Sequence, residues 1–205
     1  MESGARISVV DCSFVGPAID DAEILARFPA EIVSAFELHN GFVALDGGLH
    51  VRGACLGPDW HSLRVAWEGQ LALHSLYPAV LESDIPIAED CFGDQYLIRD
   101  GAVVHLSAET GDVEKLDMNW PEFLRHADED PVEFLMLSQL VRFLGDGGKI
   151  NPGQLLSVYP PFIAKECVNP SLRAIPALER RSFLADFAKQ IRDLPNGAKI
   201  QSVTR

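Results

Sequence analysis

Hydrophobic and polar positions alternate most regularly in the middle of the chain, and this pattern predicts three short β-strands. Residues 96–99 and 103–106 are rich in β-branched and aromatic side chains, and Asp100-Gly101 between them is typical of a tight hairpin. A second turn at 109–112 leads to residues 113–116, where the alternation returns. We therefore expect an antiparallel meander.

Helix signals follow this meander. Asn119, with Glu122 three residues later, matches a capping box that opens a helix at Trp120. Residues 130–133 supply a cap, a first-turn proline and a capping-box glutamate. They predict a continuous helix over 131–144, closed by Gly145.

The first third of the chain alternates between helix and strand signals. Residues 7–10 predict a strand, and Asp20 or Asp21 caps a short helix that ends at Arg27. A second helix runs from Pro29 to the Asn40-Gly41 turn. A hairpin of strands 42–45 and 49–51 follows. After it we expect a helix that Pro78 terminates, with a strand-turn-strand around Gly69 as the alternative.

The last third is expected to be a docked C-terminal arm. Residues 146–175 are rich in glycine and proline, which predicts an extended connection with one short helix over 154–158. Pro176 then opens an amphipathic helix with apolar side chains at Leu184, Phe187, Ala188 and Ile191. We expect residues 1–145 to form an α+β domain with an N-terminal arm and 146–205 to dock on it, as one structural domain overall.

The order of these motifs resembles the SUKH superfamily. The matching points are Ile85-Pro86, Gly93-Asp94 and Asn40-Gly41, and Trp60 and Trp67 are candidates for a mid-chain tryptophan. The resemblance covers roughly residues 21 to 145. It departs from the pattern at 89–92, where Glu, Asp, Cys and Phe occupy a loop that often carries extra glycines.

The resemblance implies a mostly antiparallel, twisted sheet with helices packed on one side, used for protein recognition. Many bacterial members of the superfamily look like immunity proteins that neutralise a toxin domain, frequently a nuclease. The expected function is therefore a non-enzymatic protein-binding module.

Charge is distributed unevenly and supports a basic partner. Residues 1–133 carry 25 acidic and 7 basic side chains, whereas residues 134–205 carry 5 and 10. Residues 82–133 alone have a net charge of −12, which would repel a phosphate backbone and attract a basic protein. We expect a basic toxin domain as partner and no direct contact with nucleic acid; a solvated, solubilising face is the alternative.

Composition excludes several other classes. No apolar run approaches the ~20 residues of a membrane span, and the first residues lack a basic segment followed by a long apolar one. The expected compartment is the cytoplasm, and the expected oligomeric state is a monomer or homodimer. The four cysteines form no CxxC pair, and the six histidines form no HxH or HExxH pattern, so we expect neither zinc nor another cofactor.

The candidate partner-binding residues are Trp60 and the acidic side chains of the meander. The acids are Glu89, Asp90, Asp94, Asp100 and Asp112. A remote alternative is a small enzyme that uses His105 with Asp94 or Cys91, which requires a polar cleft and hydrogen-bond distances. A further alternative is a scaffold or regulatory protein that self-associates through Arg180, Arg181, Lys189 and Arg192 of the C-terminal arm.

Overall fold

The structure is a computed structural model that describes residues 12–195 and 197–198, so the strand expected at 7–10 lies outside the described residues. Its main sheet has seven strands in sequence order, each antiparallel to the next. The strands are β1 (Phe14–Val15), β2 (Phe42–Ala44), β3 (Leu49–Val51), β4 (Ile85–Asp90), β5 (Gln95–Arg99), β6 (Ala102–Leu106) and β7 (Val113–Lys115). The prediction of an α+β fold with an antiparallel sheet is confirmed.

Eight α-helices and two 3₁₀ turns are present in the described part of the chain. The helices are α1 (Ala22–Leu25), α2 (Ala30–Leu38), α3 (Leu63–Trp67), α4 (Leu73–Leu76), α5 (Trp120–Glu129), α6 (Pro131–Phe134), α7 (Ser138–Gly145) and α8 (Ala177–Ile191). The 3₁₀ turns are η2 (Leu45–Gly47) and η3 (Gly69–Leu71).

Local sequence signals place the meander and α5 as expected. Asp100 and Gly101 both have positive φ angles, 51° and 81°, as a tight two-residue hairpin between β5 and β6 requires. At the start of α5, Asn119 Oδ1 accepts a hydrogen bond from Glu122 N at 3.0 Å, and Glu122 Oε2 accepts one from Asn119 N at 2.8 Å. Both halves of the predicted capping box are therefore formed.

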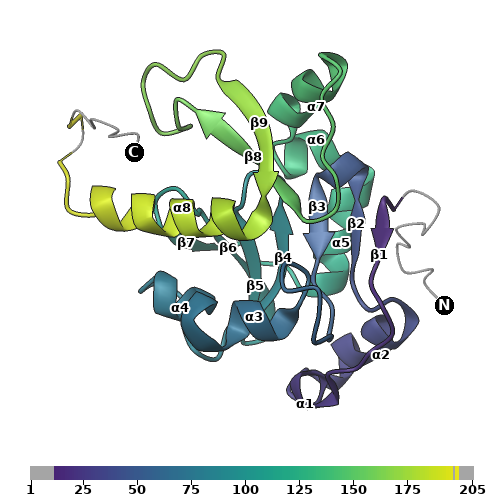
Figure 1. Cartoon of the computed structure of the whole chain (residues 1–205). Helices are drawn as coiled ribbons and strands as arrows, with labels where there is room; N and C mark the ends of the chain where they lie inside the picture. The colour runs from purple at the N-terminus through teal and green to yellow at the C-terminus, as the bar shows by residue number, and fades with distance from the viewer. Residues whose placement is uncertain (1–11, 196, 199–205) are drawn as a thin grey trace.

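Both faces of the sheet are covered. Tyr96, Ile98 and Val103 join the larger core cluster, which includes Trp120 and Phe123 of α5. Side chains that alternate with them, such as Leu97 and Val104, join a smaller cluster. That second cluster contains residues of α4 and α8, and Figure 1 shows α8 lying across the sheet. Helices therefore cover both sides of the sheet, whereas we had expected them on one side. The reason is that alternate positions of β5 and β6 are apolar on both faces.

The connection after residue 145 contains strands rather than a short helix. β8 (Gln154–Tyr159) pairs antiparallel with β9 (Ser171–Pro176) in a separate two-stranded sheet. Leu155, Leu156 and Val158 are buried, and Leu156 N donates to Cys91 O at 2.7 Å. The prediction of a helix at 154–158 is wrong. This short apolar run makes its backbone hydrogen bonds with β9, a strand some 17 residues further along the chain, which the local pattern does not reveal.

Two expected helices are interrupted. The segment after Asp130 forms α6 and α7, separated where Met136 adopts a φ of 54°. The segment before Pro78 forms α3, η3 and α4, and its break lies at Gly69, with a φ of 79°. Apolar spacing predicted helical residues in both segments but gave no signal of the break at Met136. The turn at Gly69 was part of the alternative interpretation, although helical turns rather than strands flank it.

Candidate functional site

A buried carboxylate, Glu89, lies at the centre of the most highly charged part of the interior. It belongs to β4, every residue of which is buried, and its own side chain is fully shielded from solvent. Arg52 Nη2 donates to Oε2 at 3.0 Å, and Arg181 Nε donates to the same oxygen at 2.7 Å. Arg181 Nη2 also donates to Oε1, and Gln95 Nε2 donates to Oε2 at 3.1 Å. We call Glu89, Arg52, Arg181 and Gln95, with the two histidines described next, the Glu89 cluster.

Two histidines extend this cluster toward the turn after α2. His50 Nδ1 lies 2.8 Å from Glu89 Oε1, and His50 Nε2 lies 2.9 Å from His61 Nδ1. His61 Nε2 in turn lies 3.1 Å from the carbonyl oxygen of Asn40. A continuous polar chain therefore connects β4, β3, the loop before α3 and the end of α2.

Charge inside the cluster is set by two guanidinium groups that face one carboxylate. Burial raises the pKa of Glu89, but the charges of Arg181 and Arg52 outweigh that effect and hold the pKa well below its usual value. Burial lowers the pKa of Arg52 to about 9, against the attraction of Glu89. Burial also lowers the pKa of His50 to about 4 and that of His61 to about 3, so both imidazoles are neutral near pH 7.

Asp90, the next residue, is used by its own loop. Its Oδ1 accepts hydrogen bonds from the backbone N–H groups of Phe92, Gly93 and Asp94 at 2.8, 2.8 and 3.0 Å. Burial, with the nearby charge of Asp94, raises the pKa of Asp90 to about 8, while the hydrogen bonds from Phe92 and Gly93 favour the ionised form. The carboxylate shapes the β4–β5 turn, as side-chain caps of turns commonly do.

Asp94 and His105 do meet, near the surface of β6. His105 Nε2 lies 3.1 Å from Asp94 Oδ2, and His105 Nδ1 lies 3.3 Å from Glu114 Oε1. Asp94 Oδ1 also accepts from Ala108 N at 2.8 Å. Cys91 is fully buried, and burial raises its pKa well above the usual value, which disfavours a thiolate.

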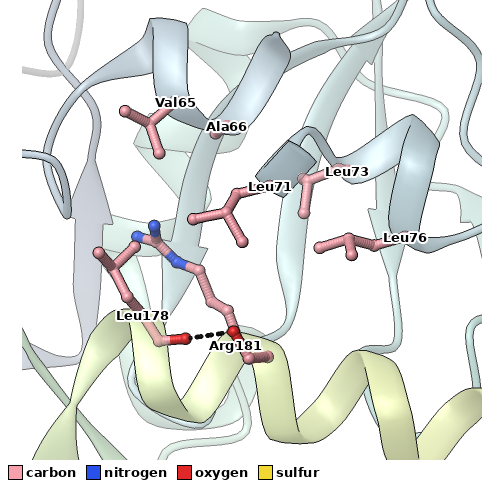
Figure 2. A pocket seen from close by; sticks show the side chains of 8 residues that line it. Val65, Ala66, Leu71, Leu73, Leu76, Leu178 and Arg181 are labelled. Carbon is pink, nitrogen blue, oxygen red and sulfur yellow. Dashed lines mark hydrogen bonds between the residues drawn. The ribbon is translucent and has the colours of Figure 1, made fainter. Parts of the chain in front are cut away.

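Two cavities beside helices in the described part of the chain are lined by other residues. One is a small apolar recess of about 10 Å³ between α3, η3, α4 and α8, lined by Ala66, Leu71, Leu73 and Leu178 among others. Figure 2 shows these side chains facing one another, with the Arg181 side chain running past them and a hydrogen bond from Ser182 Oγ to Leu178 O. This volume is about what one water molecule needs, too small for a substrate.

The second cavity is an open hollow of about 450 Å³ where α7 ends beside the start of β9. Arg142, Phe143 and Asp146 line it from α7 and the turn that follows, and Ser171 and Leu172 line it from β9. Arg142 Nη2 donates to Pro170 O across it at 2.5 Å. Among the described residues, no group of three or more His, Cys, Asp or Glu side chains is placed to hold a metal ion.

The structure separates the six expected contact residues into buried and exposed groups. The expectation that Glu89 and Asp90 contact a partner is wrong because both are buried: Glu89 is bound by two arginines, and Asp90 accepts hydrogen bonds from three backbone N–H groups. Asp94 is half-buried and bound to His105, whereas Asp100 and Asp112 are exposed. Trp60 is half-buried, with its ring 4.9 Å from Phe14 and 5.1 Å from His50.

Arg180 and Arg181 are also internal rather than available for self-association. Arg180 is 1% exposed, and its Nε donates to Phe92 O at 3.2 Å. Arg181 also donates from Nη2 to Trp60 O at 2.9 Å. Sequence inspection missed the whole Glu89 cluster, because its members come from positions 50 to 181 and no spacing signals their meeting.

Comparison with known proteins bears on the fold alone. No protein-family model matches the chain, and no curated protein matches it in sequence. A solved structure of similar fold is the crystal structure of Atu4351 from Agrobacterium tumefaciens, with a TM-score of 0.52 and 12% sequence identity. The match covers 83% of this chain and 81% of that one. The chain therefore shares an overall architecture with that protein.

Proposed function

We propose that the protein is a non-enzymatic protein-binding module that neutralises a basic, nuclease-like toxin domain, the immunity role implied by its resemblance to the SUKH superfamily. One observation carries the proposal: between residues 112 and 133 the chain exposes eight carboxylates against two basic side chains. The acids are Asp112, Glu114, Asp117, Glu122, Asp128, Glu129, Asp130 and Glu133, and the bases are Lys115 and Arg125.

Burial decides which acids can act at a distance on a partner. Carboxylates held inside by arginine, such as Glu89 and Asp84, contribute little field outside the molecule. The eight exposed acids lie on β7, α5, α6 and the turns before and between them, so the acidic surface spans the last strand of the meander and the helices after it rather than the 89–94 loop. Exposed charge of one sign accelerates association with an oppositely charged protein.

The chemistry inside the chain supports binding rather than catalysis. The Glu89 cluster is closed to solvent. Its polar side chains contact one another in series from Glu89 through His50 and His61 to the Asn40 carbonyl, so no substrate can reach them. His105 and Asp94 fall within hydrogen-bond distance, but neither lines the two cavities described above. A general base needs a substrate proton within reach, and these cavities offer His105 none.

Association kinetics test the proposal. The probes are the products of the genes that flank this one in the source genome, and the variant is the triple change Asp117→Asn, Asp128→Asn and Glu133→Gln. Its control is Glu37→Gln, Asp46→Asn and Asp59→Asn, which removes the same number of exposed charges elsewhere. We expect the first triple to lower the association rate constant about tenfold at low salt and to flatten its salt dependence, with the control changing it less than about twofold.

Equal rates for both triples would refute the electrostatic basis of the proposal. A wild-type protein that shows no binding to any basic neighbour-encoded protein would refute the immunity role itself.

A further inference from the structure

We propose that the outer surface of α6 and α7 is where a partner docks, and that the occupant is a basic segment carrying apolar side chains. We call this surface the Met136 surface; it consists of Val132, Met136 and Val141 with the flanking acids Asp128, Asp130 and Glu133. The inference rests on the proposed function and adds the place and the kind of contact.

Three large apolar side chains point outward within ten residues. Val132 is 42% exposed, Met136 78% and Val141 53%. Met136 is the most exposed large hydrophobic side chain in the described part of the chain. Singly exposed apolar residues are ordinary on protein surfaces, whereas a local concentration marks an interaction site.

The same two helices are already apolar on their inner side. Leu135, Leu137 and Leu140 are each 3% exposed or less and belong to the larger core cluster. Val132, Met136 and Val141, by contrast, belong to neither of the two core clusters. Flexible methionine side chains suit a surface that must adapt to a partner.

The backbone places Met136 at the corner between the helices. Leu137 N donates to Val132 O at 2.9 Å, and Val141 N donates to Leu137 O at 3.0 Å. These bonds carry the backbone hydrogen bonding from α6 across the corner into α7. In Figure 1 this corner lies at the upper right, away from the free end of α8.

Acidic side chains flank these apolar residues and set the sign of the partner. Asp128, Asp130 and Glu133 are exposed, and within residues 12–195 none has an ion pair. Among the described acids of residues 128–133, Glu129 is the paired one, through Arg125 Nη1 at 2.8 Å. An apolar centre with a charged rim is the usual anatomy of a protein interface, and this rim is complementary to lysine and arginine.

Charge also selects among possible occupants. A nucleic acid would be repelled by the same rim. A second copy carries a net charge of −13, so two copies repel one another at a distance. A basic amphipathic segment of another protein meets both the apolar and the charged requirement.

Three 18-residue peptides provide the probes for an NMR titration of the uniformly ¹⁵N-labelled full chain. The first has lysines on one helical face and leucines on the other, the second replaces each leucine with serine, and the third replaces each lysine of the first with glutamate. We expect the first to bind at least about tenfold more tightly than the second, with shifts concentrated at residues 128–141, and the third not to bind.

Met136→Ser is the decisive variant. It should weaken binding of the first peptide about tenfold and leave binding of the second unchanged. Val168→Ser is the matched control, since Val168 is 75% exposed in the β8–β9 loop and should have no effect. Sedimentation of the protein alone should be the same for wild type and Met136→Ser.

Several outcomes would overturn the inference. Equal affinity for the first two peptides would show that the apolar side chains do not contribute to binding. Chemical-shift changes outside residues 128–141 would place the contact elsewhere. A difference in sedimentation between wild type and Met136→Ser would make a second copy the occupant. Each would leave the proposed function standing, because that function is judged separately by the association rate of the neighbouring gene's product.

Discussion

At the scale of single residues, the histidine pair of the Glu89 cluster has one proton too few for its contacts. Three links join Glu89, His50, His61 and the Asn40 carbonyl, and both ends of this chain are acceptors. Three protons are needed, but two neutral imidazoles carry only two. Since burial lowers both histidine pKa values, the third proton is absent near pH 7, and one link lacks a hydrogen.

The tautomers follow from where a missing proton costs least. A carboxylate facing a ring lone pair is the least favourable arrangement, so His50 Nδ1–H donates to Glu89, and His61 Nδ1–H donates to His50 Nε2. The unprotonated link is then the longest one, His61 Nε2 to Asn40 O at 3.1 Å. We expect ¹⁵N spectra of histidine-labelled protein at pH 7 to show both rings as Nδ1–H tautomers; an Nε2–H signal from His50 would contradict this.

Stability should fall in mild acid because of the same pair. Their folded pKa values lie below the ordinary 6.5, at about 4 and about 3, so the unfolded chain takes up protons first. The stabilisation is complete above pH 6.5 and is lost as the pH falls toward 3, with each pKa unit contributing about 1.4 kcal/mol. Asp90 acts in the opposite direction, since its pKa is raised and its contribution declines as the pH rises toward about 8.

The measurement is urea unfolding between pH 7.5 and 5, comparing wild type with His61→Gln. The variant should lose less free energy of unfolding over this range, by about 2 kcal/mol, since pH 5 lies about 1.5 units below the ordinary histidine pKa. Identical pH dependence in the two proteins would show that His61 does not take up a proton on unfolding in this range.

At the scale of elements, α8 is attached to the sheet by a buried ion pair. Arg181 of α8 binds Glu89 of β4, and both are almost fully buried. Removing one partner of such a pair leaves an uncompensated charge, which typically costs about 3–5 kcal/mol. Glu89→Gln should destabilise the protein more than Arg181→Met. The first change leaves two buried guanidinium groups without a counter-charge, whereas the second leaves Glu89 still paired with Arg52.

The exposed pair Arg125–Glu129 is the control for this comparison. Arg125→Ala should change the free energy of unfolding by less than about 1 kcal/mol, as solvent-exposed pairs do. A Glu89→Gln protein that unfolds in urea at the wild-type midpoint would show that the cluster does not hold α8 in place.

Gly93, in the turn between β4 and β5, is a second place where this part of the chain contacts α8. Its φ is 107°, and a Cβ there would lie 2.5 Å from Leu184 Cδ1 of α8. Gly101 has a φ of 81° but open space around it. Gly101→Ala should lower the free energy of unfolding by about 1 kcal/mol, from backbone conformation alone. Gly93→Ala should lower it by at least about 1 kcal/mol more, because the added methyl group overpacks against Leu184. Equal thermal unfolding temperatures for the two variants would contradict this contact.

At the scale of the whole molecule, the C-terminal third is part of the core. Leu184 and Ala188 of α8 are each 1% exposed, and Leu156 of β8 belongs to the larger core cluster. Within the described residues no helix is long and apolar enough to cross a membrane. The charge is uneven at this scale too, with the exposed acids of 112–133 on elements distinct from α8.

Deletion of residues 170–205 should therefore unfold the protein. It removes β9, α8 and the Arg181 partner of Glu89, and exposes the apolar side chains of the smaller core cluster. We expect loss of near-ultraviolet circular dichroism and of a cooperative thermal transition. A truncated protein that stays folded and changes only its sedimentation would instead make this segment an interface, as in a self-associating scaffold.

Features encoded by neighbouring residues were predictable from the sequence. The Asp100-Gly101 hairpin, the Asn119–Glu122 capping box and the start of α8 after Pro176 depend on backbone preferences and hydrogen bonds within four residues. Breaks such as the one at Met136 were not predictable, because an ordinary side chain there adopts a conformation that only packing of α6 and α7 imposes.

The sequence by itself determined the α+β class, the antiparallel meander and the excess of acidic residues in the middle of the chain, since each depends on local pattern or on composition. Only the tertiary structure decided which acids are available. It buried Glu89 against arginines 37 and 92 positions away and left Asp112 to Glu133 exposed, because the free energy of a charge depends on its surroundings in space and not on its place in the chain.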